Sequence, residues 1–273
     1  IYAPQRTGVC VLDAHGTLVD VVLSQIPLAR LNDVILLDAR DRDRPFSLNV
    51  LSCQDPNDSD EVDDTVALVM EVYEQIFGID IRNFQIEFIL RNCLRTLIAT
   101  PGMTMRELYK ILVNEKFRQA VVANVTQEEV LWFWDRFNTK NAHVNQFIDA
   151  VANKVDPFLV NSRTRNILGQ ERTGVDFARA MDEGKIILIA FERERKQVTQ
   201  IVGPLLVVQL LKAAGARRQK QKPVYIYVDE FHNFAIPSFA ETWDEGRKDG
   251  ICVTVSHQRQ SQVSNEVVWK AAK

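Results

Sequence analysis

The sequence predicts an α/β fold, in which a mainly parallel sheet flanked by helices is interrupted by an all-helical insertion. Three observations support this prediction. Short apolar runs bounded by turn residues recur near both ends of the chain, with helical segments between them. The runs near the C-terminal end are almost continuously apolar, as in parallel strands buried on both faces. Between the two regions, apolar residues recur at helical spacing.

The first predicted strands are Gly8 to Asp13 and Asp33 to Asp38, joined by a helical segment and the Ile26-Pro27 pair. From about residue 60 the apolar spacing becomes helical. Two packed helices are predicted by the apolar residues Val62, Val66, Val69, Met70, Tyr73, Ile76, Phe77, Phe84, Phe88, Cys93, Leu94 and Leu97. Two further amphipathic faces are predicted by Val130, Phe133, Trp134, Phe137, Val144, Phe147, Ile148, Val151 and Val155.

The strand pattern returns in the last third of the chain. We expect a strand at Lys185 to Phe191, a long helix at Val198 to Ala216 and a basic loop at Arg217 to Lys222. A strand at Val224 to Val228, a helix at Phe239 to Lys248 and a last buried strand at Ile251 to Ser256 should follow. The predicted organisation is therefore a first part of the α/β core at 1–57, an all-helical insertion at 58–160 and a second part of the core at 161–273.

Composition limits the classes of protein that fit. The chain has 273 residues, 46% of them hydrophobic and 25% charged, so it can bury a large core. A formal charge of −3 lacks the overall basic excess of a dedicated nucleic-acid binder, so any DNA contact is local. The cysteines are widely spaced without a Cys-x-x-Cys pair, which predicts reduced core thiols at Cys10, Cys53, Cys93 and Cys252.

Targeting signals are not evident in the sequence. No apolar run approaches the roughly 20 residues that cross a bilayer, and no signal peptide opens the chain. These features favour a reducing compartment. The chain begins at Ile1 rather than at a methionine and ends at Lys273 soon after a strand, so we expect a fragment of a longer protein.

The most informative stretch is the apolar strand from Val224 to Val228, because two acids, Asp229 and Glu230, follow it directly. This pattern is typical of a Walker B strand, whose acids stand at the carboxyl edge of the sheet where nucleotides bind. Asp229 would hold Mg²⁺ through its water shell, and Glu230 would orient and deprotonate the attacking water. Paired acids also follow strands at structural turns and helix caps, and that alternative stays open.

Polar residues follow two other predicted strands, at Asp13-Ala14-His15-Gly16 and at His257-Gln258. If the strands are parallel, all these groups share one edge. The amide of Gln258 can both donate and accept, which suits a group that positions water or senses the γ-phosphate. The alternative is that polar residues end strands simply because loops begin there.

Other groups allow competing interpretations. Asp229, Glu230 and His232 could ligate a hydrolytic metal, but the sequence offers no second cluster, which disfavours a zinc or nuclease centre. The loop at 217–222 could contact DNA phosphates, although a solvated turn fits better because the loop precedes its strand. Trp132, Phe133 and Trp134 could stack on bases, but Phe133 and Trp134 also fit a helical core face. Phe231 and Phe234 are most simply packing residues.

The order of these motifs resembles the motor domain of conjugative type IV secretion coupling proteins, in the HerA/FtsK superfamily of ring ATPases. The resemblance covers most of the chain, and its most specific part is YVDEFHNFAIPSFAETWDEGRKDGICVTVSHQRQSQ. The other matching stretches are GVCVLDAHGTLVDVVL, IPLAR, DVILLDARDRDRPFSLNVL, GMTMRELYKILVNEKFR, RNILGQ and DFARAMDEGKIILIAF. The resemblance implies a RecA-like P-loop NTPase core with an all-helical domain. It also implies a homo-hexamer, with ATP bound between subunits and DNA in a central channel.

The resemblance also implies roles for single residues. Asp229 and Glu230 match the Walker B acids, with Asp229 contacting Mg-ATP, and Gln258 matches the strand-end glutamine. Arg247 aligns with an arginine implicated as a finger that reaches the nucleotide of a neighbouring subunit. The alternative for Arg247 is a solvated cation at a helix C-terminus, where the helix dipole favours it.

Two departures from the family pattern stand out. Ala14 and Thr17 replace the proline and aspartate that the family tends to have after its second core strand, which leaves the roles of Asp13 and His15 open. No stretch matches the phosphate loop Gly-x-x-x-x-Gly-Lys-Ser/Thr, which in the family lies just upstream of the position of Ile1. Without that loop, the chain by itself should bind ATP poorly and be inactive.

The resulting expectation is an ATPase that uses ATP and Mg²⁺ to translocate DNA or nucleoprotein in conjugation or type IV secretion. It would work in the cytoplasm, or at the cytoplasmic face of the bacterial inner membrane through an anchor outside this chain. Secretion-channel and relaxosome proteins are possible partners. Two alternatives stay open: a non-hydrolysing DNA-binding or assembly module with a decayed nucleotide site, and a HerA-like helicase that processes DNA ends.

Overall fold

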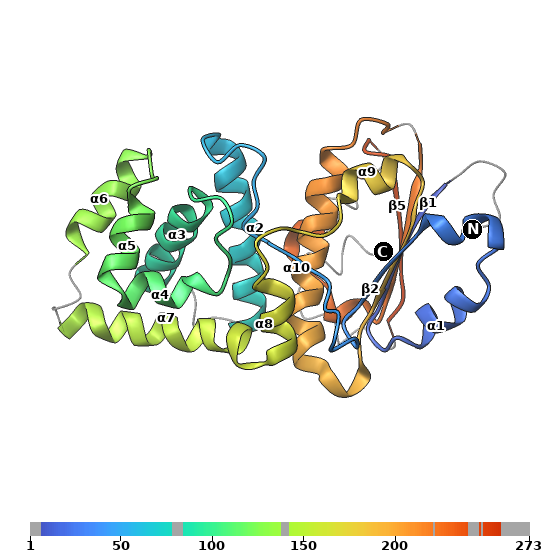
Figure 1. Cartoon of the computed structure of the whole chain (residues 1–273), viewed down its shortest axis with the longest axis horizontal. Helices are drawn as coiled ribbons and strands as arrows, with labels where there is room; N and C mark the ends of the chain where they lie inside the picture. The colour runs from blue at the N-terminus through green and yellow to red at the C-terminus, as the bar shows by residue number, and fades with distance from the viewer. Residues whose placement is uncertain are drawn as a thin grey trace. The chain divides into compact units, whose positions relative to one another are not determined.

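The structure is a computed structural model that describes residues 7–77, 84–137, 142–220, 222–239, 246 and 248–257 (Figure 1). The chain forms two compact units, one of Ile1–Phe46 with Gly174–Lys273 and one of Ser47–Thr173. The second unit therefore extends beyond the predicted insertion, 58–160, at both ends. Hydrogen bonds explain this extension, because the amide of Leu48 donates to the carbonyl of Ile167 at 3.0 Å, and the side chain of Asn49 donates to the carbonyl of Glu171 at 3.0 Å.

The first unit is built on one parallel sheet, which confirms the predicted fold class. Its strands lie in the order β2-β3-β1-β4-β5, and every neighbouring pair is parallel (Figure 1). In chain order the strands are β1 (Gly8–Asp13), β2 (Val34–Asp38), β3 (Ile186–Ala190), β4 (Val224–Asp229) and β5 (Ile251–Val255). Because the strands are parallel, their carboxyl ends meet at one edge of the sheet.

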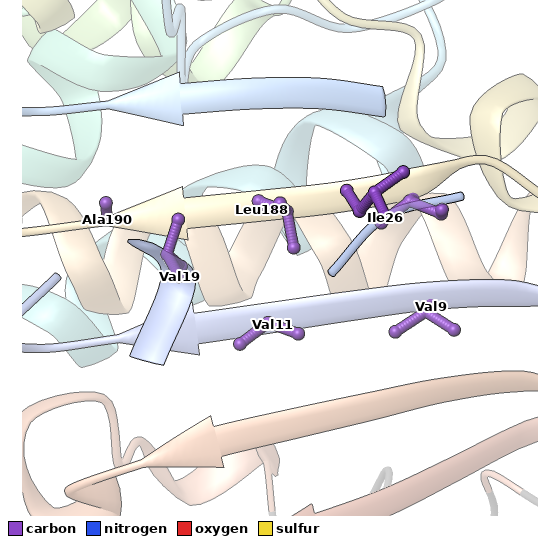
Figure 2. Packing of buried hydrophobic residues seen from close by; sticks show 7 residues of the cluster. Val9, Val11, Val19, Ile26, Leu188 and Ala190 are labelled. Atoms are coloured by element: carbon purple, nitrogen blue, oxygen red, sulfur yellow. The ribbon is translucent and has the colours of Figure 1, made fainter. Parts of the chain in front are cut away.

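One face of the sheet is covered by α1 (Thr17–Ser24) and by the turn leading to the 3-10 helix η1 (Leu28–Asp33). Figure 2 shows Val19 and Ile26 beside Val9 and Val11 of β1 and the side chains of β3. All four residues are at least nine-tenths buried. Burying a valine or isoleucine side chain contributes about 1.5–3 kcal/mol, so this cluster fixes the segment that follows β1.

The other face is covered by α10 (Lys196–Gly215), which follows the 3-10 helix η3 (Arg193–Arg195) and packs against α9 (Phe177–Asp182). Val207 and Leu210 of α10 line a small apolar cavity together with Leu12 of β1 and Ile226 of β4. The segment Arg193–Gly215 is long and apolar enough to span a membrane by length and composition, with a mean hydropathy of 1.5. However, 72% of its most apolar window is buried inside the protein, as expected of the core helix of an α/β unit.

The second unit is all-helical over its described residues, as predicted. Its helices are α2 (Ser59–Phe77), α3 (Phe84–Ile98), α4 (Glu107–Val113), α5 (Glu115–Val122), α6 (Glu128–Arg136), α7 (Ala142–Val160) and α8 (Ser162–Leu168). The predicted core positions of α2 are confirmed from Val62 to Tyr73, each at most 2% exposed. The prediction is wrong for Phe84 and Phe88, which are 77% and 49% exposed, because α3 turns Ile86, Ile89 and Leu90 inward instead.

Aromatic residues of α6 behave as the core interpretation predicts. Phe133 and Trp134 are buried, and the indole N-H of Trp134 donates to the hydroxyl of Thr96 at 2.7 Å. Trp132 is exposed, and the guanidinium of Arg136 lies over its ring at 4.5 Å from the centroid.

The last strand and the cysteines differ in part from expectation. β5 was predicted to be buried, but Cys252 and Thr254 are exposed because they share a sheet face with the exposed Tyr225 and Tyr227 of β4.

All four cysteines are free, yet Cys10 and Cys93 alone are fully buried. Burial raises the pKa of both buried thiols well above the ordinary range, because the thiolate is poorly solvated there.

Candidate active site

Three strands end in aspartates at the carboxyl edge, but two of these aspartates have structural partners. The carboxylate of Asp13 is fully buried and accepts from the amides of His15 at 2.8 Å and Val19 at 3.0 Å. It therefore caps the first turn of α1, where backbone N-H groups lack helical partners. Asp38, at the end of β2, binds the guanidinium of Arg40 at 2.9 Å. The role that the sequence leaves open for Asp13 is thus that of a helix cap.

Arg40 closes the turn that follows β1. Its guanidinium bridges Asp38 and Asp20, and it also donates to the carbonyl of Gly16 at 3.4 Å. These carboxylates raise the pKa of Arg40, and the hydrogen bond from Arg40 lowers the pKa of Asp20. Gly16 has a φ of +80°, and a Cβ there would lie 2.6 Å from the guanidinium. The turn therefore depends on glycine and holds His15 at the edge.

Asp229, at the end of β4, has a different environment. It is partly exposed, and its Oδ1 accepts a short hydrogen bond from the hydroxyl of Ser256, which follows β5. Two hard oxygen donors thus stand on neighbouring strand ends. Mg²⁺ prefers such ligands and usually keeps several waters, so a single carboxylate with a nearby hydroxyl fits this ion. Among the described residues there is no group of three or more His, Cys, Asp or Glu side chains that could hold a metal ion.

Glu230 breaks the strand at the same edge. Its backbone is left-handed, with φ 51° and ψ 54°, and it is the one non-glycine residue with positive φ within the described part of the chain. This conformation costs roughly 1–2 kcal/mol for an L-residue, and such strain clusters at functional sites. The residue is 7% exposed, and its carbonyl accepts from the backbone N-H of Asn233 at 3.0 Å and from its side chain at 3.1 Å.

The turn after Glu230 is anchored on both sides. The next residue, Phe231, is fully buried, and its amide donates to the carbonyl of Ser256 at 2.8 Å. Phe234 is also fully buried, and a Cβ at Gly203 of α10 would lie 2.7 Å from its ring. Both phenylalanines are therefore packing residues, as predicted, and they fix η4 (Phe231–Asn233) against the core.

Three of the four histidines of the sequence gather at this edge, namely His15 after β1, His232 in η4 and His257 after β5. Nδ1 of His232 lies 3.4 Å from Oε2 of Glu230. The pKa of His232 is lowered, first by burial and then by the nearby His15, His257 and Lys196, while Glu230 acts in the opposite direction. The imidazole of His232 is therefore neutral near neutral pH, and it lies beside the buried side chain of Glu230.

The structure brings Asp229 and Glu230 to one edge of the sheet, but it does not describe all the predicted site residues. Gln258 and Arg247 lie outside the described residues, as does most of the helix predicted at 239–248. Their assignments remain predictions.

The basic loop at 217–222 was interpreted as a solvated turn, and that interpretation is wrong for Arg217. Its side chain is fully buried and pairs with Asp182 at 3.1 Å, because the carbonyls of the β4 and β5 approaches converge on its guanidinium. Arg217 is thus a structural residue. Because its side chain is buried, Arg217 is not available for the DNA contact that is the alternative interpretation of this loop.

The structure is similar to solved structures of the bacterial conjugative coupling protein TrwB. Against an unbound form, the TM-score is 0.63 at 14% identity, over 97% of this chain and 61% of that chain. Similar values hold for TrwB in complex with the GTP analogue GDPNP, and for TrwB in complex with ADP and Mg²⁺ the TM-score is 0.62 at 13% identity. The chain thus spans about three fifths of the length of these proteins. No protein-family model matches the sequence, and the comparison with curated proteins found no match.

At this level of identity the similarity shows the fold alone: the chain shares the fold of the coupling protein TrwB over 97% of its length. The motifs of the sequence imply the same fold. Sequence reasoning missed Ser256 at the candidate site, and it considered His232 only as a ligand of a hydrolytic metal. A serine directly after β5 and a histidine two residues after Glu230 carry no spacing signal of their own, so only the turn geometry could reveal them.

Proposed function

We propose that this chain is the motor core of an ATP-driven DNA translocase, working in conjugation or type IV secretion as the coupling proteins do. The observation that supports it is the pair Asp229 and Glu230 at the carboxyl edge of a parallel sheet with the coupling-protein fold. Ligands of open α/β sheets bind at this edge. TrwB has been solved in complex with ADP and Mg²⁺ and with a non-hydrolysable ATP analogue, which supports ATP and Mg²⁺ as the cofactors.

The chemistry proposed for the site follows from its two acids. Asp229 and the hydroxyl of Ser256 would hold the hydrated ion of Mg-ATP, whose charge offsets the negative charge of the phosphates. Glu230 would accept a proton from the attacking water. Its buried and rigid position suits this role, because a general base must be held within hydrogen-bond reach of the proton that it removes.

Three further parts belong to the proposal. Gln258 would sense the γ-phosphate, and Arg247 would reach the nucleotide of the next subunit of a homo-hexamer, offsetting charge in the transition state. A phosphate loop, which this sequence lacks, would supply the backbone cradle for the phosphates. DNA would be the cargo, with channel and relaxosome proteins as partners.

Replacing Glu230 tests the chemistry. In the protein encoded by the complete gene, Glu230→Gln should abolish ATP turnover while leaving ATP binding largely intact, because the amide keeps the shape but cannot accept the proton. Glu183→Gln is the matched control, since Glu183 lies in the exposed turn before β3, away from the carboxyl edge. Turnover and fluorescent-nucleotide binding are measured side by side, and unchanged turnover in Glu230→Gln contradicts the assignment.

A further inference from the structure

His232 and Glu230 face each other across the turn after β4. Their closest atoms, Nδ1 and Oε2, are 3.4 Å apart, and their side chains are 25% and 9% exposed. Hydrogen bonds of active sites are often long before the substrate binds and tighten in the reacting complex. The separation is therefore compatible with a hydrogen bond that forms with little movement.

The backbone holds this contact from both sides. The left-handed conformation of Glu230 reverses the chain, so that a side chain two residues later meets its carboxylate. The carbonyl of Glu230 is held by Asn233, and the amide of Phe231 is held by Ser256. A strained turn held in this way has little freedom, so the imidazole and the carboxylate meet by construction of the fold.

We propose that His232 is a positioning residue for Glu230: the Nδ1-H of His232 donates to Oε2 of Glu230 and fixes the orientation of the carboxylate toward the attacking water. This inference rests on the proposed function of Glu230. The charged and titratable groups around the imidazole are Glu230 itself, His15 after β1, His257 after β5 and Lys196 at the start of α10. Burial and the three basic neighbours favour the neutral ring, which can orient the carboxylate without neutralising it.

Protonation of His232 changes this contact into an ion pair. An imidazolium holds the carboxylate as its counter-ion and reduces its ability to accept a proton from water. Turnover should therefore fall at acidic pH as His232 gains its proton. Because the pKa of His232 is lowered, this acidic limb should lie below the ordinary histidine value of 6.5.

Two amide substitutions of His232 distinguish a role in positioning Glu230 from a role of side-chain volume alone. The side-chain nitrogen of asparagine takes the place of Nδ1, whereas that of glutamine takes the place of Nε2. In the complete protein, His232→Asn should keep most of the turnover and lose the acidic limb of the pH profile. His232→Gln should lower kcat by about 10- to 100-fold with little change in KM, because the carboxylate loses its orientation. Equal turnover and unchanged pH profiles in both variants would overturn the proposal.

A second measurement tests the contact without hydrolysis. In the complete protein with ¹³C-labelled histidine, His232→Asn assigns the His232 signal by its loss, and the titration of that signal is compared with and without Glu230→Gln. Since Glu230 raises the pKa of His232, removing its charge should lower that pKa further. An unchanged titration would overturn the contact. The two hypotheses fail in different ways. Full turnover in Glu230→Gln would contradict the proposed function of Glu230. Lost turnover in Glu230→Gln combined with wild-type turnover in His232→Gln would contradict only the positioning role of His232.

Discussion

Arg217 gives the sharpest stability prediction, because its guanidinium uses all five of its N-H donors. Nε donates to Asp182, Nη1 donates to the carbonyls of Asp249 and Gly250, and Nη2 donates to the carbonyls of Gln219 and Lys222 in the loop that follows. The side chain is 0% exposed. Since these partners flank the starts of β4 and β5, the arginine fixes the two strands that carry the proposed site.

Replacing Arg217 by methionine fills most of the volume but removes every donor. Breaking a buried pair in this way costs about 3–5 kcal/mol, because Asp182 and the converging carbonyls lose their partner in a poorly solvated place. We expect Arg217→Met to lower the free energy of opening β4 and β5 by that amount. A factor of ten corresponds to about 1.4 kcal/mol, so amide exchange in the two strands should accelerate by roughly 100- to 4,000-fold.

Hydrogen exchange measured by mass spectrometry on peptides covering β4 and β5 checks this expectation. Arg218→Met is the matched control, since Arg218 is exposed and contributes its backbone amide to Asp182, which methionine retains. The control should stay within about 0.5 kcal/mol of the parent. Acceleration below tenfold in Arg217→Met, or equal acceleration in both variants, would refute the structural role.

Three further predictions concern the edge and the exposed sheet face. Asp13→Ala should destabilise the fold by about 2–4 kcal/mol in urea unfolding, since the buried amide of Val19 and the partly buried amide of His15 lose their acceptor; Asp13→Asn should cost less, and equal losses would contradict this. Gly16→Ala should cost at least about 1–2 kcal/mol in the same assay because of its positive φ and the clash with Arg40, and a neutral effect would contradict the strain. Brief treatment with a thiol reagent should label Cys252 well before the buried Cys10, and peptide mapping that finds equal labelling would contradict their burial.

The sheet could be predicted from the sequence because its strands are short, nearly continuous apolar runs. β3 and β4 lie within one residue of their predicted bounds, and Asp229 and Glu230 stand at the expected edge. Phe231 and Phe234 were also predicted correctly, since large aromatic residues beside a core strand usually pack. These features depend on local pattern, which the sequence carries directly.

Other features depend on which groups meet in space. The role of Asp13 required the first turn of α1 to lie over the end of β1, and the burial of Arg217 required five acceptors from separate segments to converge. Phe84 and Phe88 fit a helical stripe as well as their inward neighbours do, so spacing alone could not choose between them. The contact of His232 with Glu230 needed a positive φ at a glutamate, which is rare and has no sequence signature.

The central claim is that Asp229 and Glu230 take part in an ATP hydrolysis that moves DNA. The measurement that tests it most directly is Mg²⁺-dependent ATP turnover by the complete protein, with and without DNA, for the parent and for Glu230→Gln. We predict that DNA stimulates turnover in the parent and that Glu230→Gln is inactive under both conditions. No turnover by the parent, or equal turnover by the two proteins, would contradict this claim and favour a binding or assembly module.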